Sequence, residues 1–108
     1  MLKSIFRRPT YDGVVEAVHY RDDGQVAWVR AYERRGPTWS DHVLLDRQTL
    51  IDRLNGGRRF FAGKRNEHWA SEFEVSSPIK VVKTDIGEVL VIGKLRTEQD
   101  DLGSLPKL

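Results

Sequence analysis

Two apolar stretches near the N-terminus predict a β-hairpin. Residues 11–20 and 25–34 are rich in β-branched and aromatic side chains, and the sequence Asp-Asp-Gly at 22–24 separates them. A short loop with glycine in the left-handed conformation commonly closes such a hairpin. Across this loop the predicted register puts four pairs on one face: Tyr20 with Val26, Val18 with Trp28, Glu16 with Arg30, and Val14 with Tyr32. The acid on that face therefore meets the base on the other strand, which supports the register.

Both faces of the predicted hairpin are largely apolar. Trp28 and Tyr32 make one face bulky and aromatic, whereas small alanine and valine side chains fill much of the other. An antiparallel sheet that is open to water normally has one polar face. We therefore expect the aromatic face to be covered, either by a helix, loop or tail of the same chain or by another subunit.

The remaining pattern predicts one short helix and several more strands. Asp46 is a candidate N-cap for a helix over residues 47–55, and the glycines at 56 and 57 would end it. Pro78 predicts an edge position or a bulge. Further strands are predicted over residues 41–45, 58–65 and 72–75, and a second hairpin over residues 79–83 and 89–92. The expected fold class is mainly β: a small barrel or rolled antiparallel sheet of about six strands with one short helix.

The chain has room for one hydrophobic core. Its 108 residues are too few for a doubly wound nucleotide-binding fold, a TIM barrel or a two-domain enzyme. We expect an N-terminal tail over residues 1–9, a single β-rich domain over residues 10–93, and a polar, frayed C-terminal tail over residues 94–108.

The composition excludes cysteine chemistry. Because the chain has no cysteine, it forms no disulfide, thiolate metal site or cysteine nucleophile. The N-terminus lacks the apolar core of a signal peptide, and the longest apolar run, residues 89–92, is far shorter than a membrane span. We expect a soluble, cytoplasmic protein that does not enter a membrane.

The three histidines, His19, His42 and His68, lack the spacing of a zinc motif. A zinc or acid–base site made from His42, His68 and a carboxylate would have to assemble across space. The chain also has no nucleophile elbow and no glycine-rich phosphate loop. We therefore expect no catalytic site, no metal and no cofactor.

A basic and aromatic segment suggests one possible binding function. Cations that follow phosphates and rings that stack on bases are typical of proteins that hold single-stranded nucleic acid. This alternative hypothesis assigns nucleic-acid binding to Arg58, Arg59, Phe60, Phe61, Lys64 and Arg65. The ordinary interpretation is a strand with Phe60 and Phe61 buried on opposite faces. The net charge of +2 is low for a dedicated nucleic-acid domain.

The leading hypothesis is a non-catalytic β-module that associates with a protein partner or with itself. Tryptophan, tyrosine and arginine are common anchors of protein interfaces. The candidate partner-binding residues are Trp28, Tyr32 and Trp39. In its specific form, the hypothesis predicts a homodimer that associates through Trp28 and Tyr32.

Overall fold

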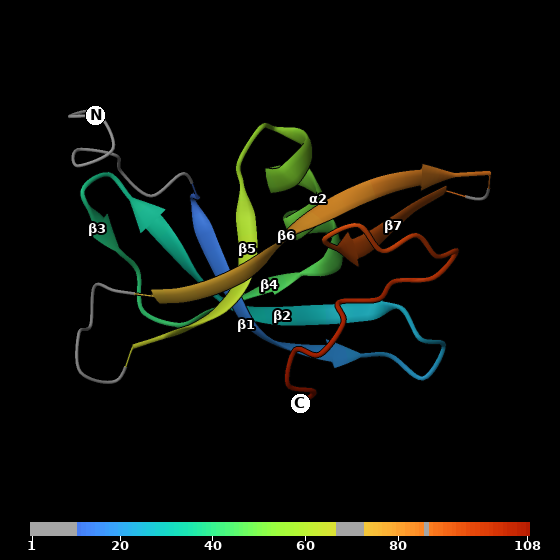
Figure 1. Ribbon diagram of the computed structural model, residues 1–108, viewed down its shortest axis with the longest axis horizontal. Helices are drawn as coiled ribbons and strands as arrows, with labels where there is room; N and C mark the ends of the chain where they lie inside the picture. Colours follow the sequence, from blue (N-terminus) through green and yellow to red (C-terminus); the bar gives the residue numbers. More distant parts are fainter. Residues whose placement is uncertain (1–10, 67–72, 86) are drawn as a thin grey trace.

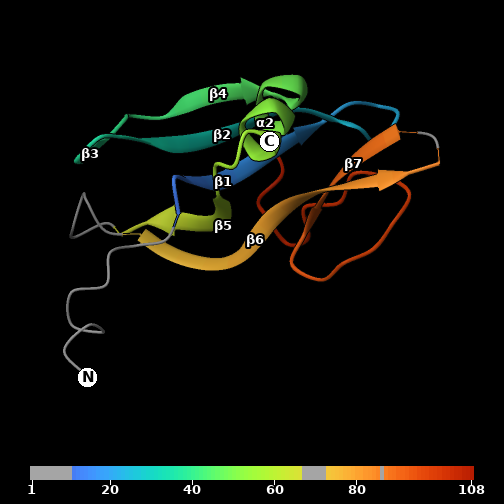
Figure 2. The ribbon, with the colours of Figure 1, turned by 90° about the horizontal axis from the view of Figure 1, so that it is seen from above.

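The computed structural model describes residues 11–66, 73–85 and 87–108. It is mainly β with one short helix, and its strands form a curled, open sheet that resembles half of a barrel (Figures 1 and 2). The expected fold class is confirmed. The expected tail at residues 1–9 lies outside the described residues, as does the start of the strand expected at residue 72. In chain order the elements are β1 (Gly13–Tyr20), β2 (Val26–Arg35), β3 (Thr38–Trp39), β4 (Val43–Asp46), α2 (Arg47–Asn55), β5 (Phe60–Arg65), β6 (Phe73–Thr84) and β7 (Gly87–Ile92).

The strand order in the sheet is β3-β2-β1-β5-β6-β7, and β4 pairs with β2 beside β3. Neighbours in this order are antiparallel except β1 and β5, which run parallel over a short stretch, Gly13–Val15 against Phe60–Ala62. The connection between β1 and β5 contains β2, β3, β4 and α2. A parallel pair needs such a long crossover, so local turn signals do not predict it.

The first hairpin forms as predicted, but two bulges change its register. Gly24 has the expected positive φ of 87°, and the predicted pairs of Val14 with Tyr32 and Tyr20 with Val26 are confirmed. Irregularities between Val15 and Ala17 and between His19 and Tyr20 shift the intervening pairs. Two predicted strand pairs, Val18 with Trp28 and Glu16 with Arg30, are therefore wrong. His19 lies opposite Trp28, and Ala17 lies opposite Arg30. A bulge adds an unpaired residue, which rotates the side chains beyond it to the other face.

The helix begins and ends at the predicted signals. The Asp46 carboxylate accepts a hydrogen bond from the backbone N–H of Thr49 at 2.8 Å, as an N-cap does. At the other end, the backbone N–H groups of Gly56 and Gly57 donate to carbonyls of the last turn, and Gly57 has a φ of 94°. Leu50 and Ile51 anchor the helix in the core.

Strand β6 changes its partner at Pro78. Its first half pairs with β5 up to Pro78, opposite Phe61, and its second half pairs with β7 from Ile79 onward. We expected an edge position or a bulge at this residue, and the ladder with β5 is irregular there and ends at Pro78. Proline cannot donate to a neighbouring strand, so it is tolerated where a ladder ends.

We expected the C-terminal segment, residues 94–108, to fray, but it packs against the rest of the chain. Leu102 is fully buried and Leu105 is 8% exposed, and both belong to the main hydrophobic cluster. The backbone N–H of Val18 donates to the carbonyl of Pro106, and the N–H of Leu108 donates to the carbonyl of Val18. This segment lies beside the part of β1 that β5 leaves unpaired. Two leucines and the backbone therefore hold a segment whose composition is otherwise polar.

Candidate functional site

The three aromatic residues expected to bind a partner have different environments. The Tyr32 side chain is only 3% exposed, because Phe73 and Arg65 of the same chain cover it. The phenol is therefore not available as a surface anchor. This corrects the expectation that a homodimer would associate through Tyr32 as well as Trp28. Trp28 and Trp39 are half-buried. The aromatic face is thus covered at the Tyr32 end by the chain itself.

The uncovered part of this face continues onto β4, the outer strand. Leu44 lies opposite Arg30, and Asp46 lies opposite Trp28, so these four side chains point to the same side of the sheet. Leu44 is 63% exposed, more than any other large hydrophobic residue among those described. We call the surface of Trp28, Arg30 and Leu44 the Leu44 face. The sequence did not single out Leu44, because an apolar Val-Leu-Leu run does not show which of its residues is left in water.

The ring of Trp28 is held in place from β1. It stacks on the imidazole of His19, with ring centres 5.0 Å apart and planes inclined by 24°. The Nδ1 atom of His19 lies 2.7 Å from the carbonyl oxygen of Leu108. The C-terminal segment therefore supports this side of the Leu44 face. A tryptophan whose ring is already fixed loses little conformational entropy when a partner packs on it.

A polar network lies next to the Leu44 face. The Oε1 atom of Glu16 is 2.8 Å from the Nε atom of Arg30 and 2.6 Å from the Nε2 atom of His42. The hydroxyl of Tyr32 lies 2.5 Å from the same His42 nitrogen. Burial raises the pKa of Tyr32, and the nearby charge of Glu16 raises it further. The predicted contact of Glu16 with Arg30 is confirmed, whereas the Glu16 contact with His42 had no signal in the sequence. His68 lies outside the described residues.

Two more arginines lie over aromatic rings, Arg65 over Tyr32 and Arg34 over Trp39. The guanidinium carbon of Arg65 lies 4.5 Å from the centre of the Tyr32 ring, and that of Arg34 lies 5.2 Å from the centre of the Trp39 ring. Within the described part of the chain, the buried Nε atoms of both arginines have no hydrogen-bond partner. The stacking on rings compensates part of that loss. The side chains of Arg34 and Arg65 therefore cover the rings of Trp39 and Tyr32.

The basic and aromatic segment does not form one continuous surface. Phe60 is fully buried in the core, so it cannot stack on a base, and Phe61 packs against Tyr11. Arg58 and Arg59 precede β5, whereas Lys64 and Arg65 end it. The structure therefore does not bring the six residues of the nucleic-acid hypothesis together. Their charges are also partly neutralised: Arg58 lies 3.8 Å from Glu33, and Lys64 lies 3.6 Å from Glu74.

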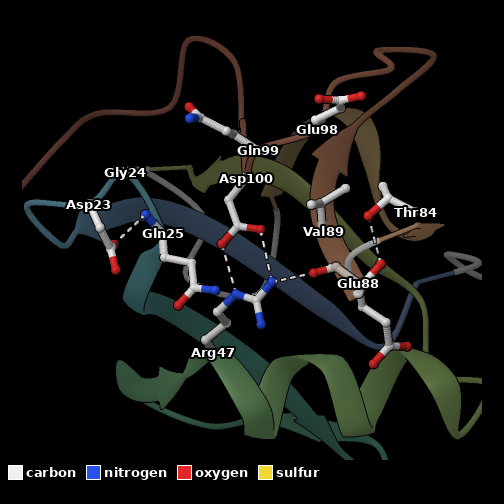
Figure 3. Close-up of a pocket in the computed structure, with 11 residues that line it drawn as sticks. Asp23, Gly24, Gln25, Arg47, Thr84, Glu88, Val89, Glu98, Gln99 and Asp100 are labelled. Atoms are coloured by element: carbon white, nitrogen blue, oxygen red, sulfur yellow. Dashed lines mark hydrogen bonds and ion pairs between the residues drawn. The ribbon is translucent and has the colours of Figure 1, made fainter.

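A polar pocket of about 390 Å³ lies between the first turn of α2, the β1–β2 turn, β7 and the C-terminal segment (Figure 3). At its base the Arg47 guanidinium contacts the Asp100 carboxylate, with the Nε and Oδ2 atoms 2.8 Å apart. The backbone N–H groups of Val26 and Leu90 donate to the same carboxylate at 2.8 and 2.9 Å. The Arg47 Nη2 atom donates to the other carboxylate oxygen, Oδ1, at 3.1 Å. All four hydrogen bonds to the carboxylate thus come from the chain itself, and the ion pair joins distant parts of the chain.

The ion pair of Arg47 and Asp100 acts as a structural link. Burial by itself would raise the pKa of Asp100, but hydrogen bonds from Arg47, Leu90 and Val26 outweigh it and lower the pKa. The carboxylate therefore stays ionised and bound to Arg47. A group held in this way is unsuited to take or give a proton near neutral pH.

No three or more histidine, aspartate or glutamate side chains in the described ranges come together where they could hold a metal ion. No helix in the described part of the chain has the length and apolar character needed to cross a bilayer. Comparisons with protein-family models, curated proteins and solved structures found no match to this chain.

Proposed function

We propose that this protein is a non-catalytic β-module that associates with a second copy of itself through the Leu44 face. The observation that carries the proposal is the exposure of Leu44, 63%, on an outer strand. Within the described residues β4 pairs only with β2, so its other edge is open. An open strand edge offers unpaired backbone groups and is a ready template for pairing with another chain.

The chemistry around Leu44 supports a protein partner. Trp28 and Arg30 flank it on the same face, and these residue types are enriched at the centres of protein interfaces. Arg30 is already paired with Glu16, so its charge is balanced before association. Two β4 strands related by a two-fold axis would extend the sheet and bring the two Leu44 side chains into one apolar patch.

Sedimentation velocity over about a hundredfold range of concentration tests this proposal. We expect the mass to rise from that of the 12.5 kDa chain towards twice that value. Leu44→Asp should keep the chain monomeric, because it places a charge at the centre of the interface. Leu95→Asp is the matched control, since Leu95 is an exposed leucine, 38%, that lies outside this face.

Two results would contradict the proposal. One is a wild-type chain that stays monomeric at every concentration. The other is a dimer that Leu44→Asp leaves intact while its circular dichroism spectrum matches the wild type. Because Leu44 is largely exposed, the substitution is not expected to disturb the fold.

A further inference from the structure

A second pocket lies where β6 leaves β5, away from the Leu44 face. It has a volume of about 410 Å³, within the range of small-molecule sites. Figure 1 shows the end of α2 beside the start of β5 and the middle of β6. Because the ladder of β5 and β6 ends at Phe61 and Pro78, and β6 pairs with β7 from Ile79 onward, Phe60 has no ladder partner on β6. The partner change at Pro78 therefore opens the pocket.

The floor of this pocket is apolar. Phe60 and Ile79 are buried, at 0% and 3% exposed, and Leu54, Phe61 and Val81 are half-buried around them. These side chains come from the last turn of α2, the start of β5 and the second half of β6. A ligand that covered the exposed parts of Leu54, Phe61 and Val81 would remove apolar surface from water, which is favourable.

The rim of the pocket is basic. Arg58, Arg59 and Lys80 are all exposed at its edge. Arg58 has Glu33 as a distant partner at 3.8 Å, but no described carboxylate pairs with the side chain of Arg59 or Lys80. The nearby Asp12 carboxylate accepts a hydrogen bond from the Arg59 backbone N–H, at 2.9 Å, and so faces the main chain. Among the residues that the structure describes, Arg59 and Lys80 therefore remain two unpaired positive charges at the rim.

We propose that this pocket binds a small amphipathic anion, a carboxylate on a medium-length alkyl chain. The alkyl chain lies on the apolar floor, and the carboxylate meets Arg59 and Lys80 at the rim. Four of the six residues that suggested nucleic-acid binding thus line one pocket, but with Phe60 as its floor and not as a stacking platform. The inference does not depend on self-association, since it uses other elements.

Titration of the ¹⁵N-labelled protein with decanoate, below its micelle concentration, tests the inference by amide chemical shifts. We expect shifts at Leu54, Arg59, Ile79 and Val81, with a dissociation constant of about 0.1–1 mM. Decanol and decyltrimethylammonium have the same chain without the negative charge. They should shift these amides far less at equal concentration.

Charge-reversal variants test the role of the rim. The double variant Arg59→Glu, Lys80→Glu should weaken decanoate binding about tenfold or more, because it replaces two attractions with two repulsions. The double variant Arg35→Glu, Lys83→Glu changes the net charge equally but alters exposed residues outside the pocket, and it should bind as the wild type does. All four side chains are exposed, so the variants should fold.

Several outcomes would overturn the inference: shifts confined to another surface, an equal response to the cationic ligand, or unchanged affinity in the rim variant. Binding to vesicles of anionic lipid without binding to monomeric decanoate would also overturn it, and would indicate a membrane surface instead. None of these outcomes depends on whether the chain forms a dimer.

Discussion

Arg47, in the first turn of α2, binds the carboxylate of Asp100 in the C-terminal segment, with the Nε and Oδ2 atoms 2.8 Å apart. The two residues are 53 positions apart in the sequence. Arg47 also donates to the carbonyl of Glu88 on β7, and Asp100 accepts from the backbone of β2 and β7. This one pair therefore joins the helix, both hairpins and the C-terminal segment.

The first prediction concerns the charge of Asp100. Its side chain is fully buried, so Asp100→Asn leaves the Arg47 guanidinium without its counter-ion. We expect the free energy of unfolding to fall by about 3 kcal/mol. Urea denaturation measures this change. Asp22→Asn, in the exposed β1–β2 turn, is the control and should alter stability by less than about 0.5 kcal/mol. Equal stability of the two variants would contradict the structural role of the pair.

The second prediction follows from the lowered pKa of Asp100. A folded-state pKa below the unfolded value of about 3.9 stabilises the protein above that value. The contribution is lost as the pH falls through the folded-state pKa, because the carboxyl group is then protonated. Urea midpoints of the wild type and of Asp100→Asn should therefore converge below about pH 4. Midpoints that stay equally far apart at every pH would show that the charge of Asp100 does not stabilise the fold.

The third prediction concerns the docked C-terminal segment. Leu102 is fully buried, so Leu102→Ala should reduce the free energy of unfolding by about 3 kcal/mol. Leu95→Ala removes the same atoms from a residue that is 38% exposed, and should cost less than about 1 kcal/mol. Thermal unfolding of the two variants compares them directly. If both variants melt together with the wild type, the segment is not packed as described.

The fourth prediction concerns Gly63, at the close approach of β5 and β6. A Cβ atom there would lie 2.4 Å from the backbone carbonyl oxygen of Glu74. Because backbone cannot move as a side chain can, Gly63→Ala should cost about 2 kcal/mol or more. In Gly56→Ala the new Cβ lies 3.2 Å from the Asp52 carbonyl oxygen, so a smaller loss is expected. Chemical denaturation that ranks Gly56→Ala as the more damaging change would contradict the described strand contact.

The parts of the fold that were predicted rest on neighbouring residues. The turn at Gly24, the N-cap Asp46 and the glycines that end α2 each act within a few positions of the chain. Such signals are visible in a sequence because their hydrogen bonds are local. The side-chain contact of Glu16 with Arg30 was also predicted, and it forms although a bulge places Ala17 opposite Arg30.

The parts that were missed depend on distant contacts. Nothing near Leu102 in the sequence shows that it belongs to the main hydrophobic cluster, which strands and helix α2 build together. The bulges that bring His19 opposite Trp28 also lack a local signal. At the candidate sites, Leu44 and Lys80 became relevant only when the strands next to them were known.

By itself the sequence determined the class of fold, the first hairpin and the helix with its two ends, because hydrophobic period, turn residues and caps act over short distances. The tertiary structure decided which apolar side chains are used for the core and which face water. It buried Tyr32 beneath Arg65 and left Leu44 exposed, although both lie in apolar stretches. The physical reason is that burial depends on which segments pack on a residue, and those segments are brought together only by folding of the whole chain.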